Sequence, residues 1–285
     1  MLGQMMSQAT SPIPELLLSL VDVIEQANQL LVQFYENSAQ LDIQQKSDQS
    51  PVTAADLAAH HQIVTALLQL TPDIPVLSEE SADHSERHQW SRFWLLDPLD
   101  GTKEFINRTD EFTVNLALIE DGQVGYAFIG VPVKGQIYAT DGYSAWRIDE
   151  FGWQKLVAKP VSESWSLAIS REANKQQGER YQRFLQHLSK PHQLINAGSA
   201  YKFCLMAEGQ IDVYPRLHPT SEWDTAAGQG LLQVLGGGLI DEQGRAFSYN
   251  QRARLENGVF VAYRCLDHRE HSLAAMQAAL DLGCA

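Results

Sequence analysis

The segment FWLLDPLDGTKEF, residues 93–105, is the feature that most constrains the fold of this chain. An apolar run typical of a buried strand ends in Asp97 and Asp100, with Pro98 between them and Gly101 directly after. Two like charges at the end of a buried strand are costly unless a cation lies near them. The segment therefore predicts a strand that delivers two carboxylates to a binding site.

The spacing within this segment has a physical reason. Pro98 stiffens the turn and favours an extended Asp97, and Gly101 allows a tight turn or a close backbone approach to a ligand. Asp97 and Asp100 could then point into one cavity, with the Leu99 carbonyl between them. Carboxylates and a carbonyl form an oxygen donor set that suits Mg²⁺ better than zinc. For this segment alone, an ordinary turn is the alternative.

Other acidic residues also fall at the ends of predicted elements. Glu79 and Glu80 follow a short predicted strand, Asp56 lies in the first turn of a predicted helix, and Asp224 opens another helix. The loops beyond strand ends are where sites are built in sheet proteins. Asp224 alone would be an ordinary acid at a helix N-terminus. Together with the DPLD pair, these positions indicate a metal site.

Composition and charge exclude several classes of function. The chain has 285 residues, of which 44% are hydrophobic and 20% charged, so a packed globular core is expected. The net charge of -14, without a Lys/Arg run, argues against nonspecific binding to nucleic acid or anionic lipid. The cysteines Cys204, Cys265 and Cys284 are few and far apart. They indicate a reducing compartment rather than a disulfide framework, and Cys204 is expected in the core.

The N-terminal region predicts neither a signal peptide nor a membrane span. Residues 1–14 lack a basic segment followed by an apolar one. The apolar stretch 13–36 is interrupted by charged residues at helical spacing, which is typical of an amphipathic helix. We therefore expect a soluble, cytosolic protein.

The pattern of elements changes near residue 160. Before it, we expect two helices, a short strand in IPVLSEE, a continuous apolar strand at 92–97 and an antiparallel meander over residues 112–148. The runs of the meander are separated by EDGQ, VKGQ and TDGY. After it, strands are expected at 166–170, 192–197, 211–217 and 258–263, and helices at 179–188, 199–209, 222–237 and 271–283. Such alternation predicts an α/β layer. We expect two closely packed halves, an α+β half at 1–160 and an α/β half at 161–285.

Three motifs resemble the signature of the inositol monophosphatase-like, Mg²⁺-dependent and Li⁺-sensitive phosphatases. They are SEES at 78–81, DPLDGT at 97–102 and WDTAAG at 223–228, in the family order. Inositol monophosphatases usually continue the second motif with Thr-Asn-Phe, whereas this chain has Lys-Glu-Phe and is more similar to the 3′(2′),5′-bisphosphate nucleotidase branch. The resemblance extends over nearly the whole chain and implies an α/β fold, the layered α/β/α/β/α sugar-phosphatase arrangement.

The resemblance also implies a reaction. The 3′-phosphate of adenosine 3′,5′-bisphosphate would be removed to give AMP and phosphate, and 3′-phosphoadenosine 5′-phosphosulfate is a second expected substrate. Such an activity would belong to sulfur metabolism and would be inhibited by Li⁺. It would operate in the cytoplasm or attached peripherally to the cytoplasmic side of the inner membrane. An inositol or sugar monophosphatase and a non-catalytic Mg²⁺-binding regulatory protein are the alternatives.

The resemblance further implies two Mg²⁺ ions, or three, in one active site. Glu79, Asp97 and the Leu99 carbonyl would hold one ion. Asp97, Asp100 and Asp224 would hold the second, with Asp97 bridging. Two ions held in this way clamp the attacking and leaving oxygens of a phosphoryl transfer.

Catalytic and phosphate-binding roles follow from the same resemblance. Thr102, oriented by Asp56, would position and deprotonate a water, with Glu79 as the other candidate. Gly101 and Thr102 can offer backbone N–H groups to the phosphate.

A second phosphate needs further cationic contacts. Ser199 and Lys202 lie at the start of a predicted helix, where anions bind, and the guanidinium of Arg216 suits phosphate. A helix cap and surface cations are the alternative interpretation, and Ser170 and Arg171 are weaker candidates. The residues expected to contact the substrate are Glu79, Leu99, Asp100, Gly101, Thr102, Ser199, Lys202, Arg216 and Asp224.

Overall fold

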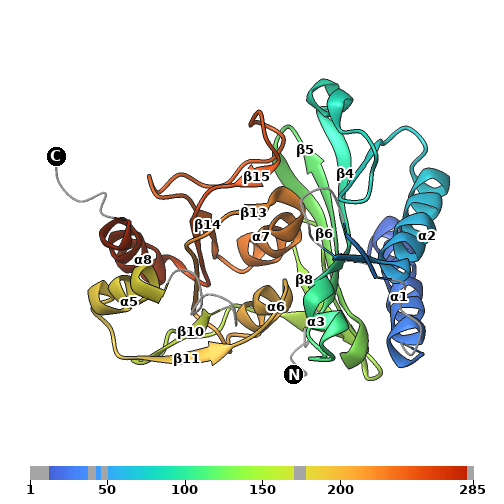
Figure 1. Cartoon of the computed structure of the whole chain (residues 1–285). Helices are drawn as coiled ribbons and strands as arrows, with labels where there is room; N and C mark the ends of the chain where they lie inside the picture. Colours follow the sequence, from blue (N-terminus) through green and yellow to red (C-terminus); the bar gives the residue numbers. More distant parts are fainter. Residues whose placement is uncertain (1–12, 38–42, 46–50, 170–177, 281–285) are drawn as a thin grey trace, which may run out of the picture.

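The chain folds into five alternating layers of helices and sheets (Figure 1). The computed structural model describes residues 13–37, 43–45, 51–169 and 178–280, with strand pairing alone at 43–45 and 51–53. From one side to the other, the layers are α1 (Glu15–Glu36) and α2 (Ala54–Leu70), a seven-stranded sheet, α6 (Tyr201–Ala207) and α7 (Ala226–Val234), a five-stranded sheet, and α5 (Gly178–His187) with α8 (Leu266–Ala279). This order confirms the expected α/β/α/β/α arrangement.

The seven-stranded sheet is formed by strands in sequence order. They are β3 (Val76–Ser78), β4 (Arg92–Asp100), β5 (Thr113–Glu120), β6 (Gln123–Val131), β7 (Gln136–Thr140), β8 (Ala145–Asp149) and β9 (Gly152–Leu156). Only the β3–β4 pair is parallel among them. The predicted antiparallel meander is confirmed. The half-exposed edge strand β9 extends it beyond the predicted range.

The five-stranded sheet has the order β11-β10-β12-β16-β14. Its strands are β10 (Trp165–Ile169), β11 (His192–Asn196), β12 (Val213–Arg216), β14 (Gly238–Ile240) and β16 (Phe260–Tyr263). Strand β10 is parallel to β11 and β12, whereas β16 is antiparallel to β12 and β14. The α/β alternation of this half is confirmed, although β14 follows a glycine run and was not predicted.

The helix predicted at 222–237 is divided in the structure. A 3-10 turn, η4 (Glu222–Asp224), comes first, and α7 begins only at Ala226. The final helix begins at Leu266, earlier than the predicted start, and residues 281–283 of the prediction lie outside the described residues. The remaining short elements are β1 (Ile43–Gln45), β2 (Pro51–Thr53), η2 (Ser85–Gln89), α3 (Thr102–Ile106), η3 (Pro132–Lys134), β13 (Thr220–Ser221) and β15 (Glu256–Asn257).

Both faces of the seven-stranded sheet are covered by apolar side chains. On β5, Leu116 and Leu118 face the cluster under α1 and α2, whereas Ala117 and Ile119 face the cluster between the two sheets. A strand buried on both faces reads as a continuous apolar run, because neither face needs polar residues. This is why the segment TVNLALI is so apolar.

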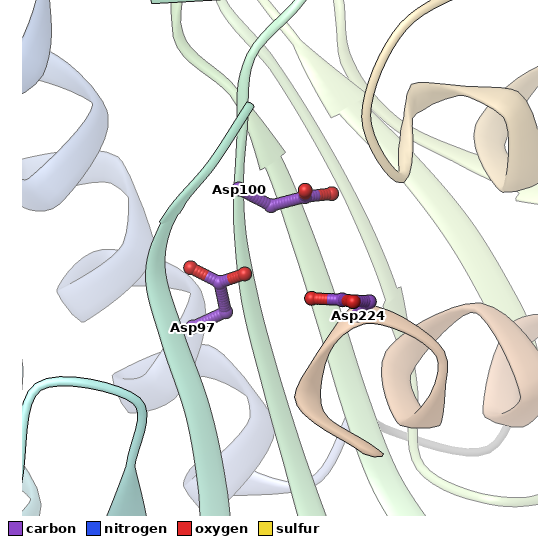
Figure 2. A group of neighbouring side chains, drawn as sticks. All are labelled: Asp97, Asp100 and Asp224. Carbon is purple, nitrogen blue, oxygen red and sulfur yellow. The ribbon is translucent and has the colours of Figure 1, made fainter. Parts of the chain in front are cut away.

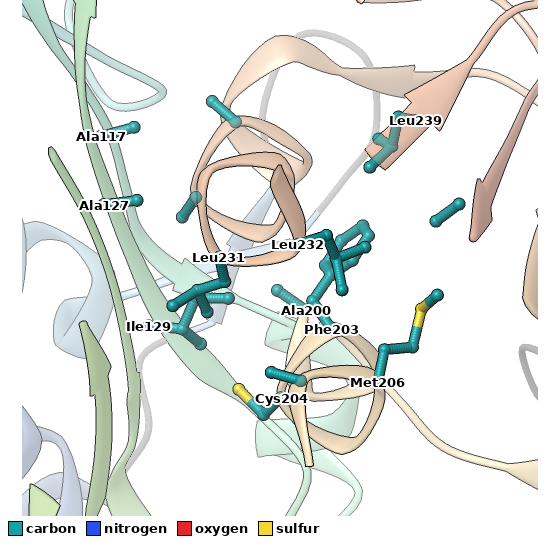
Figure 3. Packing of buried hydrophobic residues seen from close by; sticks show 14 of the residues in the cluster. Ala117, Ala127, Ile129, Ala200, Phe203, Cys204, Met206, Leu231, Leu232 and Leu239 are labelled. Carbon is teal, nitrogen blue, oxygen red and sulfur yellow. The ribbon is translucent and has the colours of Figure 1, made fainter. Parts of the chain in front are cut away.

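Helices α6 and α7 fill the space between the sheets (Figure 3). Leu231 of α7 and Cys204 of α6 belong to this core, and Cys204 is fully buried, as predicted. Helix α7 approaches the sheet closely at Gly230, where an added Cβ would lie 2.8 Å from the Cβ of Ala127. Since α6 and α7 come from the second half of the sequence, the predicted halves share one core. The division at residue 160 stays a prediction.

Among the helices in the described part of the chain, none combines the length and the apolar character that crossing a bilayer requires.

Candidate active site

Strand β4 presents Asp97 and Asp100 to the same side through an irregularity in its pairing. The sequence predicts a strand that ends at Asp97, whereas β4 runs to Asp100, and its register shifts between these two residues. Asp97 lies opposite Asn115 and Asp100 opposite Thr113, so one extra residue is inserted on β4. Residues three apart on a regular strand point to opposite faces. The bulge around Pro98 removes this alternation, and both carboxylates approach one point (Figure 2).

The η4 turn supplies the third carboxylate. Asp224 closes a capping box with Ser221, whose backbone N–H donates to the Asp224 carboxylate at 2.7 Å. One oxygen of each carboxylate of Asp97, Asp100 and Asp224 lies within 4.8 Å of the others (Figure 2). The structure therefore brings together acids that are more than a hundred residues apart in the sequence.

The electrostatics of the acidic cluster favour a bound cation. Burial raises the pKa of Asp97 well above its ordinary value, and the carboxylates of Glu79, Asp100 and Asp224 raise it further. Burial, followed by Asp100 and Glu79, raises the pKa of Asp224 to about 8. A divalent cation would relieve this repulsion, and an all-oxygen donor set suits Mg²⁺. The residues present therefore fit the metal that the sequence predicts.

Glu79 lies beside the cluster but outside its innermost group. It follows β3, and its backbone N–H donates to the Leu96 carbonyl at 3.0 Å. Its carboxylate raises the pKa values of Asp97 and Asp224, so it faces them electrostatically. It is not among the acids whose oxygens lie within 4.8 Å of one another. Its role as a metal ligand stays a prediction.

Thr102 and Asp56 are in contact, as the sequence predicts. The Thr102 hydroxyl lies 3.3 Å from a carboxylate oxygen of Asp56 and 3.4 Å from the Leu99 carbonyl. Asp56 is buried in the first turn of α2. Gly101 has a φ of +89°, which permits the sharp change from β4 into α3, a helix that the sequence did not predict. The catalytic role of the pair stays a prediction.

A cavity of about 150 Å³ adjoins the acidic cluster. Among the residues that line it are Asp100, Gly101, Ser199, Lys202, Arg216 and Asp224. Predicted metal ligands and predicted phosphate ligands therefore line the same space. We call the part lined by Asp100 and Asp224 the acidic side, and the part lined by Lys202 and Arg216 the cationic side. Ser170 and Arg171, the weaker candidates, lie outside the described residues.

Ser199 holds a carboxylate in the structure. Its backbone is left-handed, with a φ of 49°, and its hydroxyl lies 2.7 Å from Oδ2 of Asp100. The same oxygen accepts from the Ala200 backbone N–H at 2.6 Å and from the Asn115 amide at 3.3 Å. Thr113 contacts the Ser199 hydroxyl at 2.6 Å. Thr113 and Asn115 were not predicted as site residues, although polar side chains in an otherwise apolar strand are a signal for such a role.

Lys202 is not a surface cation, so the alternative interpretation is wrong for this residue. Only 2% of it is exposed, and its ammonium donates to the Ala197 carbonyl at 3.1 Å. Burial, followed by the charge of Arg216, lowers the pKa of Lys202 to about 8. Arg216 is partly buried at the end of β12. Lys202 and Arg216 thus line the same cavity.

Known proteins place the chain in a family. The model of the inositol monophosphatase family matches residues 15–278. The chain belongs to the inositol monophosphatase family. It is 44% identical over 236 residues to the 3′(2′),5′-bisphosphate nucleotidase CysQ of Salmonella typhimurium, covering 82% of this chain and 94% of that protein. It is 35% identical to the CysQ of Haemophilus influenzae, covering 83% of this chain and 88% of that protein.

Solved structures of the family agree with the fold. The CysQ of Bacteroides thetaiotaomicron superposes with a TM-score of 0.74 at 32% identity, covering 87% of this chain and 96% of that chain. An inositol monophosphatase of Thermotoga maritima has a TM-score of 0.74 at 19% identity, covering 92% and 97% of the two chains, and shares the fold. Members of the family depend on Mg²⁺ in general, and the acidic cluster is consistent with a Mg²⁺-dependent phosphatase.

Proposed function

We propose that the protein is a 3′(2′),5′-bisphosphate nucleotidase that converts adenosine 3′,5′-bisphosphate to AMP and phosphate. The observation that carries the proposal is that the acids Asp100 and Asp224 line the same cavity as the cations Lys202 and Arg216. A monophosphate can use only the acidic side, through bound metal, whereas a bisphosphate can use both. The CysQ relatives support this substrate class.

The acidic side would hold two Mg²⁺ ions. Glu79, Asp97 and the Leu99 carbonyl would hold one, and Asp97 would share the other with Asp100 and Asp224. When bound, Mg²⁺ neutralises charge on the phosphoryl group and lowers the pKa of water. The carboxylates of the chain fix where those effects act, since phosphoryl transfer depends mainly on positioning and charge neutralisation.

Thr102 and Asp56 would handle the proton of the attacking water. The Thr102 hydroxyl donates to Asp56 at 3.3 Å. Its remaining lone pairs can therefore accept a hydrogen bond from water, and the proton released can pass toward the Asp56 carboxylate. Glu79 is the other candidate acceptor. Gly101 and Thr102 would offer backbone N–H groups to the phosphate under attack, and no phospho-enzyme is required.

The cationic side would bind the phosphate that is not cleaved. Lys202 and Arg216 can each donate to its oxygens, and charge-assisted hydrogen bonds of this kind are the strong ones. Ser199, which contacts Asp100, would also contact the substrate. The 5′-phosphosulfate of 3′-phosphoadenosine 5′-phosphosulfate carries negative charge at the same place, so this nucleotide is the second proposed substrate.

Phosphate release measured side by side tests the proposal. Adenosine 3′,5′-bisphosphate, 3′-phosphoadenosine 5′-phosphosulfate, 3′-AMP and inositol 1-phosphate are compared with Mg²⁺ and with a chelator. We expect the highest kcat/KM on the bisphosphate, loss of activity with the chelator and inhibition by Li⁺. A preference for inositol 1-phosphate would identify a monophosphatase instead. No release from any of the four, despite Mg²⁺ binding, would support a non-catalytic protein.

A further inference from the structure

We propose that Tyr214 is a positioning residue that holds Lys202 and Arg216 at a fixed spacing, and that it thereby sets the preference for a second phosphate on the nucleotide. The inference deepens the proposed function and rests on it. Tyr214 lines the same cavity as the two cations and is 3% exposed.

Strand geometry places Tyr214 and Arg216 side by side. They are two residues apart on β12, where side chains alternate between faces, so both point to the same side of the sheet. Val213, on the other face, belongs to the core under α5 and α8, whereas Tyr214 belongs to the core between the sheets. Tyr214 and Arg216 pair with Ala262 and Phe260 of β16, which fixes their register.

One tyrosine contacts both cations. The Tyr214 hydroxyl accepts a hydrogen bond from Nη1 of Arg216 at 3.2 Å. The ammonium of Lys202 lies 5.0 Å from the centre of the Tyr214 ring, within the range of a cation–π interaction. The hydroxyl therefore positions the guanidinium, and the ring positions the ammonium.

The ring itself is held in place by its neighbours. Phe203 of α6 packs edge-on at 5.7 Å between ring centres, and Phe260 of β16 packs edge-on at 5.6 Å. Since α6 also carries Lys202, the ring joins the helix that supplies one cation to the strand that supplies the other. A buried ring between two aromatic neighbours gives this link a single orientation.

The charges around Tyr214 call for an anion. Lys202 is almost fully buried, and Arg216 lowers its pKa by repulsion. The Nε of Arg216 is buried and makes no hydrogen bond to the described residues. Asp100, Glu104 and Glu111 are the charged groups that act on Lys202 in the opposite direction. A phosphate dianion between the two cations would supply the missing acceptor and offset their repulsion.

Tyr214→Phe is the sharpest test, because it removes the acceptor for Arg216 and keeps the ring that faces Lys202. We expect the KM and the dissociation constant for adenosine 3′,5′-bisphosphate to rise about tenfold, as for the loss of one hydrogen bond to a charged group. The kcat and the kinetic constants for 3′-AMP should stay unchanged. Tyr138→Phe is the matched control, since Tyr138 is equally buried but donates to Glu208 at 2.7 Å outside the cavity.

A double-mutant cycle separates positioning from general damage. If Tyr214 acts through Arg216, Tyr214→Phe should add little to the effect of Arg216→Ala on bisphosphate binding. Additive effects, or an equal loss on 3′-AMP, would overturn the inference. An unchanged dissociation constant in Tyr214→Phe would overturn it as well.

Binding in the presence of a chelator keeps this test distinct from that of the proposed function. Calorimetry with adenosine 3′,5′-bisphosphate and 3′-AMP, without metal, reports on the cationic side alone. If the wild-type protein binds the bisphosphate more tightly and Tyr214→Phe removes that difference, the inference holds even where no hydrolysis is seen. Equal wild-type affinity for the two nucleotides would refute the role of Tyr214 in selectivity.

Discussion

The acidic and cationic sides of the cavity both bury charged groups of one sign, and in both the burial shifts the pKa values of those groups. On the acidic side, burial and mutual repulsion raise the pKa values of Asp97 and Asp224. On the cationic side, burial and Arg216 lower the pKa of Lys202. Each side holds charges that the protein alone destabilises. We therefore expect the acidic side to hold the metal ions that act in catalysis and the cationic side to determine substrate selectivity.

The largest expected effect is that of Asp97→Asn on the acidic side. The variant should lower Mg²⁺-dependent phosphate release from both adenosine 3′,5′-bisphosphate and 3′-AMP by about a thousandfold or more, because a metal ligand and its charge are lost. The fold should persist, since the asparagine carbonyl can still accept from the Leu99 N–H, which lies 3.1 Å from the Asp97 carboxylate. Rates on both substrates and the melting temperature with and without Mg²⁺ provide the check.

Asp83→Asn is the control for that variant. Asp83 lies shortly after Glu79 in the sequence but is exposed, and its carboxylate accepts a hydrogen bond from the Ser85 backbone N–H. Its substitution should leave rates and Mg²⁺ stabilisation as in the wild type. Full activity of Asp97→Asn would remove Asp97 from the proposed metal site.

A smaller and more selective effect is expected on the cationic side. Lys202→Ala and Arg216→Ala should each raise the KM for adenosine 3′,5′-bisphosphate about tenfold to a hundredfold, because each removes a charged hydrogen-bond donor. The KM for 3′-AMP should change little, since that nucleotide lacks the second phosphate. Steady-state kinetics on the two substrates measure the contrast. An equal loss of activity on adenosine 3′,5′-bisphosphate and on 3′-AMP would show that the cationic side does not determine selectivity.

The smallest effect is a pH dependence of opposite sign for the two sides in the metal-free protein. The folded-state pKa of Asp224 is raised to about 8 from 3.8, so the native state binds more protons and stability falls as pH rises toward 8. The folded-state pKa of Lys202 is lowered to about 8 from 10.5, so stability from this group rises with pH between these values.

Urea unfolding in a chelator, from pH 5 to pH 10, can resolve the two contributions. Asp224→Asn should flatten the fall below pH 8, and Lys202→Met should flatten the rise above it. Saturating Mg²⁺ should suppress the first slope in the wild type, because bound metal favours the ionised carboxylates. A steeper fall in Asp224→Asn than in the wild type would contradict the repulsion described for the acidic side.

Part of the site could be read from the sequence because its residue types are chemically unusual where they stand. Carboxylates after the apolar run at 93–96 need a cation. The contact between Asp56 and Thr102 was expected only from the resemblance to the family. Tyr214 gave no such signal, since a tyrosine in an apolar strand is ordinary core. Ser199 was read as a phosphate ligand, and its contact with Asp100 depends on a left-handed backbone that its residue type does not indicate.

Local patterns by themselves determined the meander, the α/β alternation and the identity of the acidic residues, because hydrophobic periodicity and turn residues act over short distances. The five layers were expected only from the resemblance to a known family. Only the tertiary structure decided that a bulge turns Asp97 and Asp100 to one side, that Lys202 is buried, and that Tyr214 joins it to Arg216. These outcomes depend on how α6, β4 and β12 meet across a shared core. The strength of a charge or a hydrogen bond there is set by burial, which no single segment of the chain specifies.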